Sequence, residues 1–483
     1  MVIDTKVNLL KRRRTKIVAT LGPASSAPGM IKQLIEAGVN VFRLNMSHGE
    51  HDFHRESFNN IRRIADETGK PIAVLVDLCG PKIRTGKFRN GEITLTANSK
   101  VTVTTRDILG EEGIIPSQYK ALADDVKARD RILLNDGALE LVVNSVTGTE
   151  IDCTVIHGGV LKNHKGINLP GVEVSAASLT EKDRVDAEFA LELGIDFLAL
   201  SFVRTAADIG DLKSIIRKSG KDVAIIAKIE KPEALANATA ILDIADGIMV
   251  ARGDLGVELN PEEVPVAQSQ LIYLARRKFK PVIVATQMLE SMIESARPTR
   301  AEVTDVSHAV TLGTDAVMLS AETAAGAFPL EAVKMMDRIA RQTESHLWKA
   351  GSYDLAPQVK REFPVSIWDA LPDATAQLSR ELMVRAVLVI SQSGMSAATM
   401  SSARPSAPVV AITGQAHVCR RMNLFWSVIP VLAEDAGNVN PNELARRFAR
   451  ELGLAESGEP VLLVRGFHSD PMQNTPSVTV LSV

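Results

Sequence analysis

Short apolar runs alternate with longer amphipathic stretches from residue 15 to about residue 346. Apolar runs of four or five residues are typical of buried strands in a parallel sheet, and the stretches between them have helical spacing. Strands are expected at 16–20, 40–44, 72–76 and 197–200, and four more open at 223, 247, 282 and 316. This α/β pattern predicts a (β/α)8, or TIM, barrel. An open doubly wound sheet is the alternative, but its usual glycine-rich first turn is poorly matched by GPAS after the first strand.

The alternation breaks after the third strand. Segments such as EITLT, KVTVTT and EIDCTVIHG have strand-like periodicity, with Gly, Asn and Asp between them. They predict a small β-barrel or sandwich inserted as a lid, with the turn-rich HKGINLPG as its hinge.

A second α/β unit follows the polar linker SYDLAPQVKREFP, with strands at 386–390, 409–412, 428–431, 461–464 and near 478–481. The predicted divisions are therefore an N-terminal arm at 1–14, the barrel at 15–79 and 175–346, the insert at 80–174, and a C-terminal unit at 355–483.

The composition mainly excludes certain classes of protein. The 483 residues are 45% hydrophobic and 23% charged with a net charge of -3, so the totals indicate neither a nucleic-acid-binding surface nor disorder. The one basic run, 11–14, is interpreted as a solvated arm. Cys79, Cys153 and Cys419 lie far apart, which argues against a disulfide framework or a zinc site and fits a reducing cytoplasm. We expect no membrane association, because no signal peptide or apolar run of transmembrane length is present.

Polar residues follow three of the apolar runs between 223 and 286. They include Lys228 and Glu230, then Gly253 and Asp254, then Thr286. The carboxyl ends of parallel strands share one edge, where such barrels carry their chemistry. Two carboxylates suit Mg²⁺, and a nearby lysine suits a transferring phosphoryl group, although a plain salt bridge would also explain an acid beside a lysine.

Other strand ends carry further candidates. Arg43 and Asn45 follow the second strand, and an arginine there suits carboxylate or phosphate recognition. Arg84 and Lys165 stand at the start and the end of the insert and would reach nucleotide phosphates if it closes over the barrel. Neither GxxxxGK[ST] nor GxGxxG occurs, which excludes the P-loop and protein-kinase folds.

In the C-terminal unit, the loop SQSGMS precedes a predicted helix. Serine and glycine at a helix N-terminus can wrap a phosphate, but capping by Ser393 or Ser396 alone explains the same residues. Both interpretations stay open on chemistry alone.

Long motifs in order strongly resemble the pyruvate kinase family from about residue 15 to 346, with weaker similarity beyond: RLNMSHG, GPKIRTG, IAKIEKPE, GIMVARGDLGVEL, KPVIVATQMLESMIESARPTRAE and DAVMLSAETAAGAFPLEAV. The resemblance implies phosphoryl transfer from phosphoenolpyruvate to ADP, giving pyruvate and ATP, as the last step of glycolysis.

The resemblance also implies residue roles. Glu230 and Asp254 would hold Mg²⁺ or Mn²⁺, and Lys228 would stabilise the transferring group and the enolate. Other implied roles are phosphoryl binding by Arg43, substrate carboxylate binding by Gly253, Asp254 and Thr286, nucleotide contacts by Asn45, Arg84 and Lys165, and enolate protonation through Thr286, Ser320 and Glu322.

One departure concerns K⁺. Many members have DTKGPEIRTG where this chain has DLCGPKIRTG. Leu78 removes a hydroxyl ligand, and Lys82 places an ammonium where the family has an acid. We therefore expect activity without K⁺.

The C-terminal unit resembles the family's effector domain, and SQSGMSA is similar to its phosphate-binding loop, comprising Ser391, Gln392, Ser393, Gly394 and Ser396. The last loop, RGFHSDPMQNTPS, lacks the glycine-rich sequence of fructose-1,6-bisphosphate-activated members. The implied activator is a sugar monophosphate or AMP, acting on a cytoplasmic homotetramer.

Two other classes compete. A metal-dependent lyase or aldolase acting on a 2-oxo acid would need no nucleotide lid, and ADP-dependent pyruvate release separates the two. A non-catalytic protein with this fold would be expected to have lost Lys228, Glu230 or Asp254, and all three are present.

Overall fold

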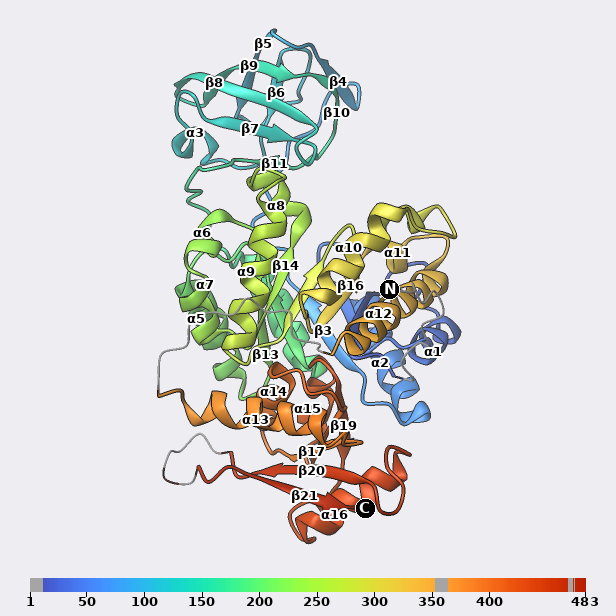
Figure 1. Ribbon diagram of the computed structural model, residues 1–483. Coiled ribbons are helices and arrows are strands. Elements are labelled where there is room, and N and C mark those ends of the chain that lie inside the picture. The colour runs from blue at the N-terminus through green and yellow to red at the C-terminus, as the bar shows by residue number, and fades with distance from the viewer. Residues whose placement is uncertain (1–11, 352–363, 468–471, 473) are drawn as a thin grey trace, which may run out of the picture.

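The computed structural model describes residues 12–351, 364–467, 472 and 474–483. Most of the predicted arm (1–11), most of the predicted linker and part of the last loop lie outside the described residues. Eight parallel strands close into a barrel in the order β1-β16-β15-β14-β13-β12-β3-β2, which confirms the predicted barrel (Figure 1). The strands are β1 (Lys16–Thr20), β2 (Val41–Asn45), β3 (Ala73–Asp77), β12 (Phe197–Leu200), β13 (Ala224–Ile229), β14 (Gly247–Ala251), β15 (Val282–Ala285) and β16 (Ala316–Leu319).

Helices surround the barrel, and a large apolar core fills the space between them and the strands. They are α1 (Pro28–Glu36), α2 (His51–Thr68), α4 (Glu181–Leu193), α5 (Ala206–Ser219), α6 (Pro232–Ala236), α7 (Ala238–Ile244), α8 (Arg252–Glu258), α9 (Val264–Arg277), η1 (Glu290–Ile293), α10 (Arg300–Thr311), α11 (Ala321–Ala324) and α12 (Pro329–Lys349). None of the helices in the described residues is long and apolar enough to cross a membrane.

Two local features of these elements matter for the site. β13 continues through Lys228 because that residue still pairs with Met249 of β14. The polar residues after β14 begin the short helix α8, Arg252–Glu258, so Gly253 and Asp254 lie in a first helical turn. Amides in such a turn have no carbonyl partners within their own helix.

The insert stands beyond one end of the barrel, joined to it by two chain crossings (Figure 1). A six-stranded sheet in the order β11-β7-β8-β9-β5-β6 and a two-stranded sheet, β10-β4, share one apolar core. The elements are β4 (Glu92–Leu95), β5 (Lys100–Thr104), β6 (Ile114–Pro116), α3 (Leu122–Asp125), β7 (Arg131–Leu134), β8 (Leu139–Thr147), β9 (Glu150–His157), β10 (Gly159–Lys162) and β11 (Ile167–Asn168).

The C-terminal unit is a five-stranded sheet in the order β19-β18-β17-β20-β21, with β21 antiparallel. Its elements are α13 (Ile367–Glu381), β17 (Val387–Ile390), α14 (Met395–Ser402), β18 (Val409–Thr413), α15 (Ala416–Met422), β19 (Val428–Leu432), α16 (Pro441–Glu451), β20 (Pro460–Arg465) and β21 (Ser477–Ser482). The unit lies at the end of the barrel opposite the insert (Figure 1).

A polar residue just before every second strand accepts a hydrogen bond from the first or second amide of a neighbouring strand. These pairs are Asn40 with Ile17 (3.0 Å), Asp196 with Val74 (2.8 Å), Asp246 with Ile225 (2.8 Å) and Asp315 with Val282 (3.1 Å). We call this ring the N-terminal edge of the barrel.

The C-terminal unit docks on the N-terminal edge. Arg420 lies 2.7 Å from Asp196, and Arg404 lies 3.2 Å from Asp315. Leu424, fully buried, joins the cluster of apolar side chains inside the barrel. The C-terminal unit therefore fills this end of the barrel with Leu424. It also supplies arginines that pair with Asp196 and Asp315 of the N-terminal edge.

The interpretation of 11–14 as a solvated arm is wrong for Arg13 and Arg14. Arg13 donates to the Gly38 carbonyl at 2.6 Å and pairs with Asp337, while Arg14 is 9% exposed. The partners of Arg13 belong to the barrel, whereas the Arg14 guanidinium donates to Ser427 Oγ and the Ser406 carbonyl of the C-terminal unit, which lie far away in sequence.

Candidate active site

Lys228, near the end of β13, is the centre of a buried charge cluster at the C-terminal edge of the barrel. Its Nζ lies 2.9 Å from Glu230 Oε1 and 3.3 Å from Asp77 Oδ1, and it donates to Ser201 Oγ at 2.6 Å. Burial disfavours its charged form, but the two carboxylates outweigh burial and raise the pKa of Lys228. The ammonium is therefore a permanent charge held in one place.

Arg43 provides a second cation on the other side of Asp77. Its Nε donates to Asp77 Oδ2 at 2.7 Å, and Nη1 donates to Thr20 Oγ1 at 3.1 Å. Burial tends to raise the pKa of Asp77, but Lys228 and Arg43 hold that pKa below its usual range. Asp77 thus fixes both cations toward the same edge.

Glu230 is fully buried and only partly satisfied. Its Oε2 accepts the Phe202 amide at 2.8 Å, and its Oε1 pairs with the Lys228 ammonium at 2.9 Å without a further hydrogen bond. Burial raises the pKa of Glu230, Lys228 opposes this, and Asp254 adds to the increase. No group of three or more His, Cys, Asp or Glu side chains gathers as a metal site in the described part of the chain. Two neighbouring carboxylates, one of them fully buried, nevertheless fit a divalent cation completed by water and substrate.

Thr286 and α8 meet where substrate carboxylate binding is expected. The Gly253 amide donates to Thr286 Oγ1 at 2.7 Å. Thr286 and Gln287 have left-handed backbones, with φ of 67° and 53°, which β-branched threonine rarely adopts. Arg252 holds this turn by donating to the Thr286 carbonyl at 2.8 Å. The strain keeps a hydroxyl beside the first turn of α8.

Glu322 ties two loops together. One of its carboxylate oxygens accepts the Leu289 amide at 3.1 Å, and the other accepts the Ser320 amide at 2.6 Å. Burial raises the pKa of Glu322, and these amides oppose the increase. Glu322 therefore fixes Ser320 relative to the turn that carries Thr286.

The expected nucleotide residues divide into two groups. Arg84 and Lys165 lie on adjacent segments where the insert joins the barrel, because Arg84 bridges Gly166 and donates to the His164 carbonyl at 3.1 Å. Asn45 ends β2 on the barrel itself and accepts the Ser47 amide at 3.2 Å. The backbone bridge between Arg84 and Gly166 brings Arg84 next to the segment of Lys165. Asn45 lies on the barrel, apart from these two residues.

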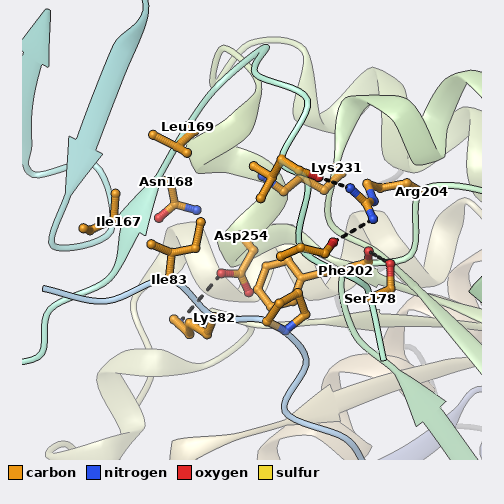
Figure 2. A pocket seen from close by; sticks show the side chains of 13 residues that line it. Lys82, Ile83, Ile167, Asn168, Leu169, Ser178, Phe202, Arg204, Lys231 and Asp254 are labelled. Atoms are coloured by element: carbon orange, nitrogen blue, oxygen red, sulfur yellow. Dashed lines mark hydrogen bonds and ion pairs between the residues drawn. The ribbon is translucent and has the colours of Figure 1, made fainter. Parts of the chain in front are cut away.

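Lys82 reaches across to the barrel. Its Nζ lies 3.9 Å from Asp254 Oδ1, and Figure 2 shows the two side chains meeting below Ile83 and Asn168. Both also line a cleft of about 580 Å³ between the insert and α8, a size suited to a small substrate.

A buried junction links the insert to this edge. Glu258, the last residue of α8, lies 2.6 Å from Lys231 Nζ and accepts from Asn168 of the insert at 3.3 Å. Lys231 directly follows Glu230 in the chain. One carboxylate therefore connects the hinge, the helix of Asp254 and the segment of Glu230.

The loop 391–396 leads from β17 into α14. Gly394 has φ of 86°, and its amide donates to Ser391 Oγ at 3.0 Å. Gln392 and Ser393 are exposed, whereas Ser391 and Ser396 are buried. Ser391 therefore stabilises the turn internally, and the exposed pair faces solvent.

The sequence analysis did not identify three residues that contact the site. Ser201 joins Lys228 to the Leu78 carbonyl, Thr20 receives Arg43, and Glu258 joins the insert. Ser201 and Thr20 stand at the ends of apolar runs, so the strand-end rule could have found them. Glu258 had no such signal, since it lies on a helix.

Comparisons with known proteins show which family this chain is similar to. Residues 12–333 match a family model described as pyruvate kinase, barrel domain, and 369–481 match pyruvate kinase, alpha/beta domain. Pyruvate kinase 2 of Synechocystis sp. is 44% identical over 94% of this chain and 76% of its own, and a pyruvate kinase of Geobacillus stearothermophilus is 44% identical over 98% and 80%. A crystal structure of a pyruvate kinase from Cryptosporidium parvum superposes with a TM-score of 0.88 at 35% identity, covering 97% of this chain and 96% of that one.

Proposed function

The chain belongs to the pyruvate kinase family, and we propose that its charge cluster around Lys228 performs the transfer from phosphoenolpyruvate to ADP. The observation that carries this assignment is the pair of cations, Lys228 and Arg43, fixed by one buried carboxylate, Asp77. In the reaction, the bond between phosphorus and the enol oxygen breaks and a β-phosphate oxygen of ADP bonds to phosphorus. Such a transfer needs positioning and charge neutralisation rather than covalent catalysis by the protein.

Glu230 and Asp254 would hold Mg²⁺ or Mn²⁺. The surroundings of Glu230 support this role, because its buried Oε1 is held by the ion pair with Lys228 alone and can also coordinate a cation. When bound, the ion neutralises charge on substrate oxygens.

The first turn of α8 would bind the substrate carboxylate. The amides of Gly253 and Asp254 lie at a helix N-terminus, where anions are favoured. The Gly253 amide donates to Thr286 Oγ1, so the carboxylate would replace or share that acceptor. The Thr286 hydroxyl donates to the Ala285 carbonyl at 2.6 Å, and it would turn away from that carbonyl to donate to the ligand.

Thr286, Ser320 and Glu322 would serve the protonation of the enolate. Both oxygens of Glu322 accept backbone amides, so we assign it the role of holding the two hydroxyl residues in place. The proton would then reach the enolate from the side of the site that carries the hydroxyl groups of Thr286 and Ser320.

The nucleotide would lie in the cleft under the insert, with Arg84 and Lys165 on its phosphates and Asn45 at the barrel side. The 3.9 Å approach of Lys82 to Asp254 supports K⁺-independence, because the ammonium brings a monovalent charge to the metal side of the site. Near-full activity in buffer free of K⁺ and NH₄⁺ is expected, and loss of most activity there would refute this assignment.

We further propose activation by a phosphorylated metabolite, a sugar monophosphate or AMP, at Ser391, Gln392, Ser393, Gly394 and Ser396 in a cytoplasmic homotetramer. Exposed Ser393 beside the first turn of α14 supports this. Replacing Ser393 and Ser396 by Asp should abolish activation and spare basal turnover, whereas unchanged activation would exclude the loop.

The deciding experiment measures pyruvate and ATP formed from phosphoenolpyruvate with and without ADP and Mg²⁺. Equal amounts of both products, absent without ADP, are expected. Release of pyruvate without ADP would favour a lyase instead. Lys228→Gln should lose activity, and Lys162→Gln, an exposed lysine of the insert, is its matched control.

A further inference from the structure

A cavity of about 390 Å³ lies away from the active site, where residues 12–14, the end of α12 and the C-terminal unit meet. Its size is in the range of small-molecule pockets. Three arginines line it, Arg12, Arg14 and Arg385, together with an apolar wall that includes Trp348 and Leu454. None of the residues of the 391–396 loop lines it.

The charge of this lining is of one sign. No carboxylate is among the described residues that form it. Arg385 pairs with Glu459 outside the cavity, at 2.5 Å. Arg12 is exposed, and its one hydrogen bond runs to the Leu452 carbonyl at 3.0 Å. Arg12 and Arg14 therefore leave the described lining with a positive charge, and walls of low polarity strengthen the potential of such a charge.

Arg14 is the least compensated of the three. It is only 9% exposed, yet its hydrogen bonds go to neutral groups, Ser427 Oγ at 2.9 Å and the Ser406 carbonyl at 3.1 Å. Among the described residues it forms no ion pair, and its Nε has no hydrogen-bond partner. A buried guanidinium without a counter-charge is unfavourable, and an anion from solution would offset that cost.

We propose that this cavity binds a phosphomonoester metabolite, with its phosphate between Arg12 and Arg14 and its carbon body against Trp348. Guanidinium groups match phosphate oxygens in geometry, and one half-buried indole with an aliphatic neighbour suits a sugar or nucleoside body.

A ligand here would join the two units of the protein. The Arg14 carbonyl accepts the Ser427 amide at 2.8 Å, and the Arg14 amide donates to Glu344 of α12 at 2.8 Å. β1 begins two residues later at Lys16. Occupancy should therefore stabilise the attachment of the C-terminal unit to the barrel and raise the unfolding temperature.

The test uses the full chain and calorimetric titration with ribose 5-phosphate, with ribose and inorganic phosphate as comparison probes. Met383 lines the same cavity and is 62% exposed, so its substitution leaves the core intact. Met383→Glu adds a carboxylate, and Met383→Gln adds an uncharged amide of nearly the same shape. We expect ribose 5-phosphate to bind the wild type and Met383→Gln alike, Met383→Glu and Arg12→Gln at least about tenfold more weakly, and ribose not at all.

Ser393→Asp separates this cavity from the 391–396 loop. It should leave the tenfold contrast between the two Met383 variants intact. Loss of all binding in Ser393→Asp, equal binding by Met383→Glu and Met383→Gln, or no binding by the wild type would each overturn the proposal. Phosphoryl transfer is measured on the same samples and should be unchanged by Met383→Gln, so failure here does not bear on the active site.

Discussion

The two edges of the barrel bury carboxylates for opposite purposes. At the N-terminal edge, Asp196 accepts a strand amide, Arg62 and Arg420, so its oxygens are fully used. At the C-terminal edge, Oε1 of Glu230 has no partner beyond its ion pair with Lys228, and Thr286 is held in a strained backbone. The same chemical group stabilises the protein where it is satisfied and is available for chemistry where it is not.

The largest expected effect is a loss of activity from a substitution at the C-terminal edge. Glu230→Gln keeps the shape of the side chain but removes the charge that would hold the metal, so kcat/KM should fall by about 10³-fold. The value of kcat/KM is expressed per folded molecule, measured by urea unfolding, because the change also removes one of the two carboxylates that pair with Lys228. Wild-type turnover in Glu230→Gln at saturating Mg²⁺ would contradict the metal assignment.

The N-terminal edge should respond in the opposite way. Asp196→Asn leaves two arginines facing an amide in a fully buried position, and the free energy of unfolding should fall by about 3 kcal/mol, while kcat per folded molecule is kept. Asp222→Asn is the matched control, since its carboxylate also pairs with an arginine of the C-terminal unit but is 71% exposed. It should lose less than about 0.5 kcal/mol. Equal losses of unfolding free energy in Asp196→Asn and Asp222→Asn would contradict the stabilising role of the buried carboxylate.

Lys16 gives the N-terminal edge a pH dependence. It is buried where β1 meets the C-terminal unit, donates to the Val428 carbonyl at 2.6 Å, and burial lowers its pKa to about 7. Between about pH 7 and its ordinary pKa of 10.5, the unfolded chain keeps the proton that the folded chain has released, so stability rises with pH there. Its contribution approaches about 1.4 kcal/mol per pH unit. Urea unfolding at pH 7, 8 and 9 should show a steeper rise for the wild type than for Lys16→Met, and parallel slopes would refute it.

The smallest effect concerns the junction between the insert and the catalytic edge. Asn168→Ala removes the hydrogen bond from the insert to Glu258, so the half-saturating ADP concentration should rise about three- to tenfold with kcat nearly constant. Asn144→Ala, on an exposed face of the insert, should change neither parameter. An equal drop in kcat for both variants would indicate general damage to the insert.

Much of the catalytic edge was predictable because it follows from local order. Lys228, Glu230 and Thr286 each lie at or just beyond the end of a buried apolar run, and closing the barrel brings those ends together. The partner of each charge was not predictable. Asp77 pairs with Arg43 and Lys228, which are 34 and 151 positions away in sequence, and no local pattern encodes such a choice.

The sequence by itself determined the alternation of strands and helices, the place of the insert, and the edge that carries the chemistry, because burial imposes a period on the chain. Only the tertiary structure decided that Arg14 is buried and Arg13 half-buried, that Leu424 closes the barrel from below, and that Glu258 joins the insert to the site. Those contacts depend on how separately formed units pack together, and a buried charge is tolerated only where a distant partner, or a ligand, meets it.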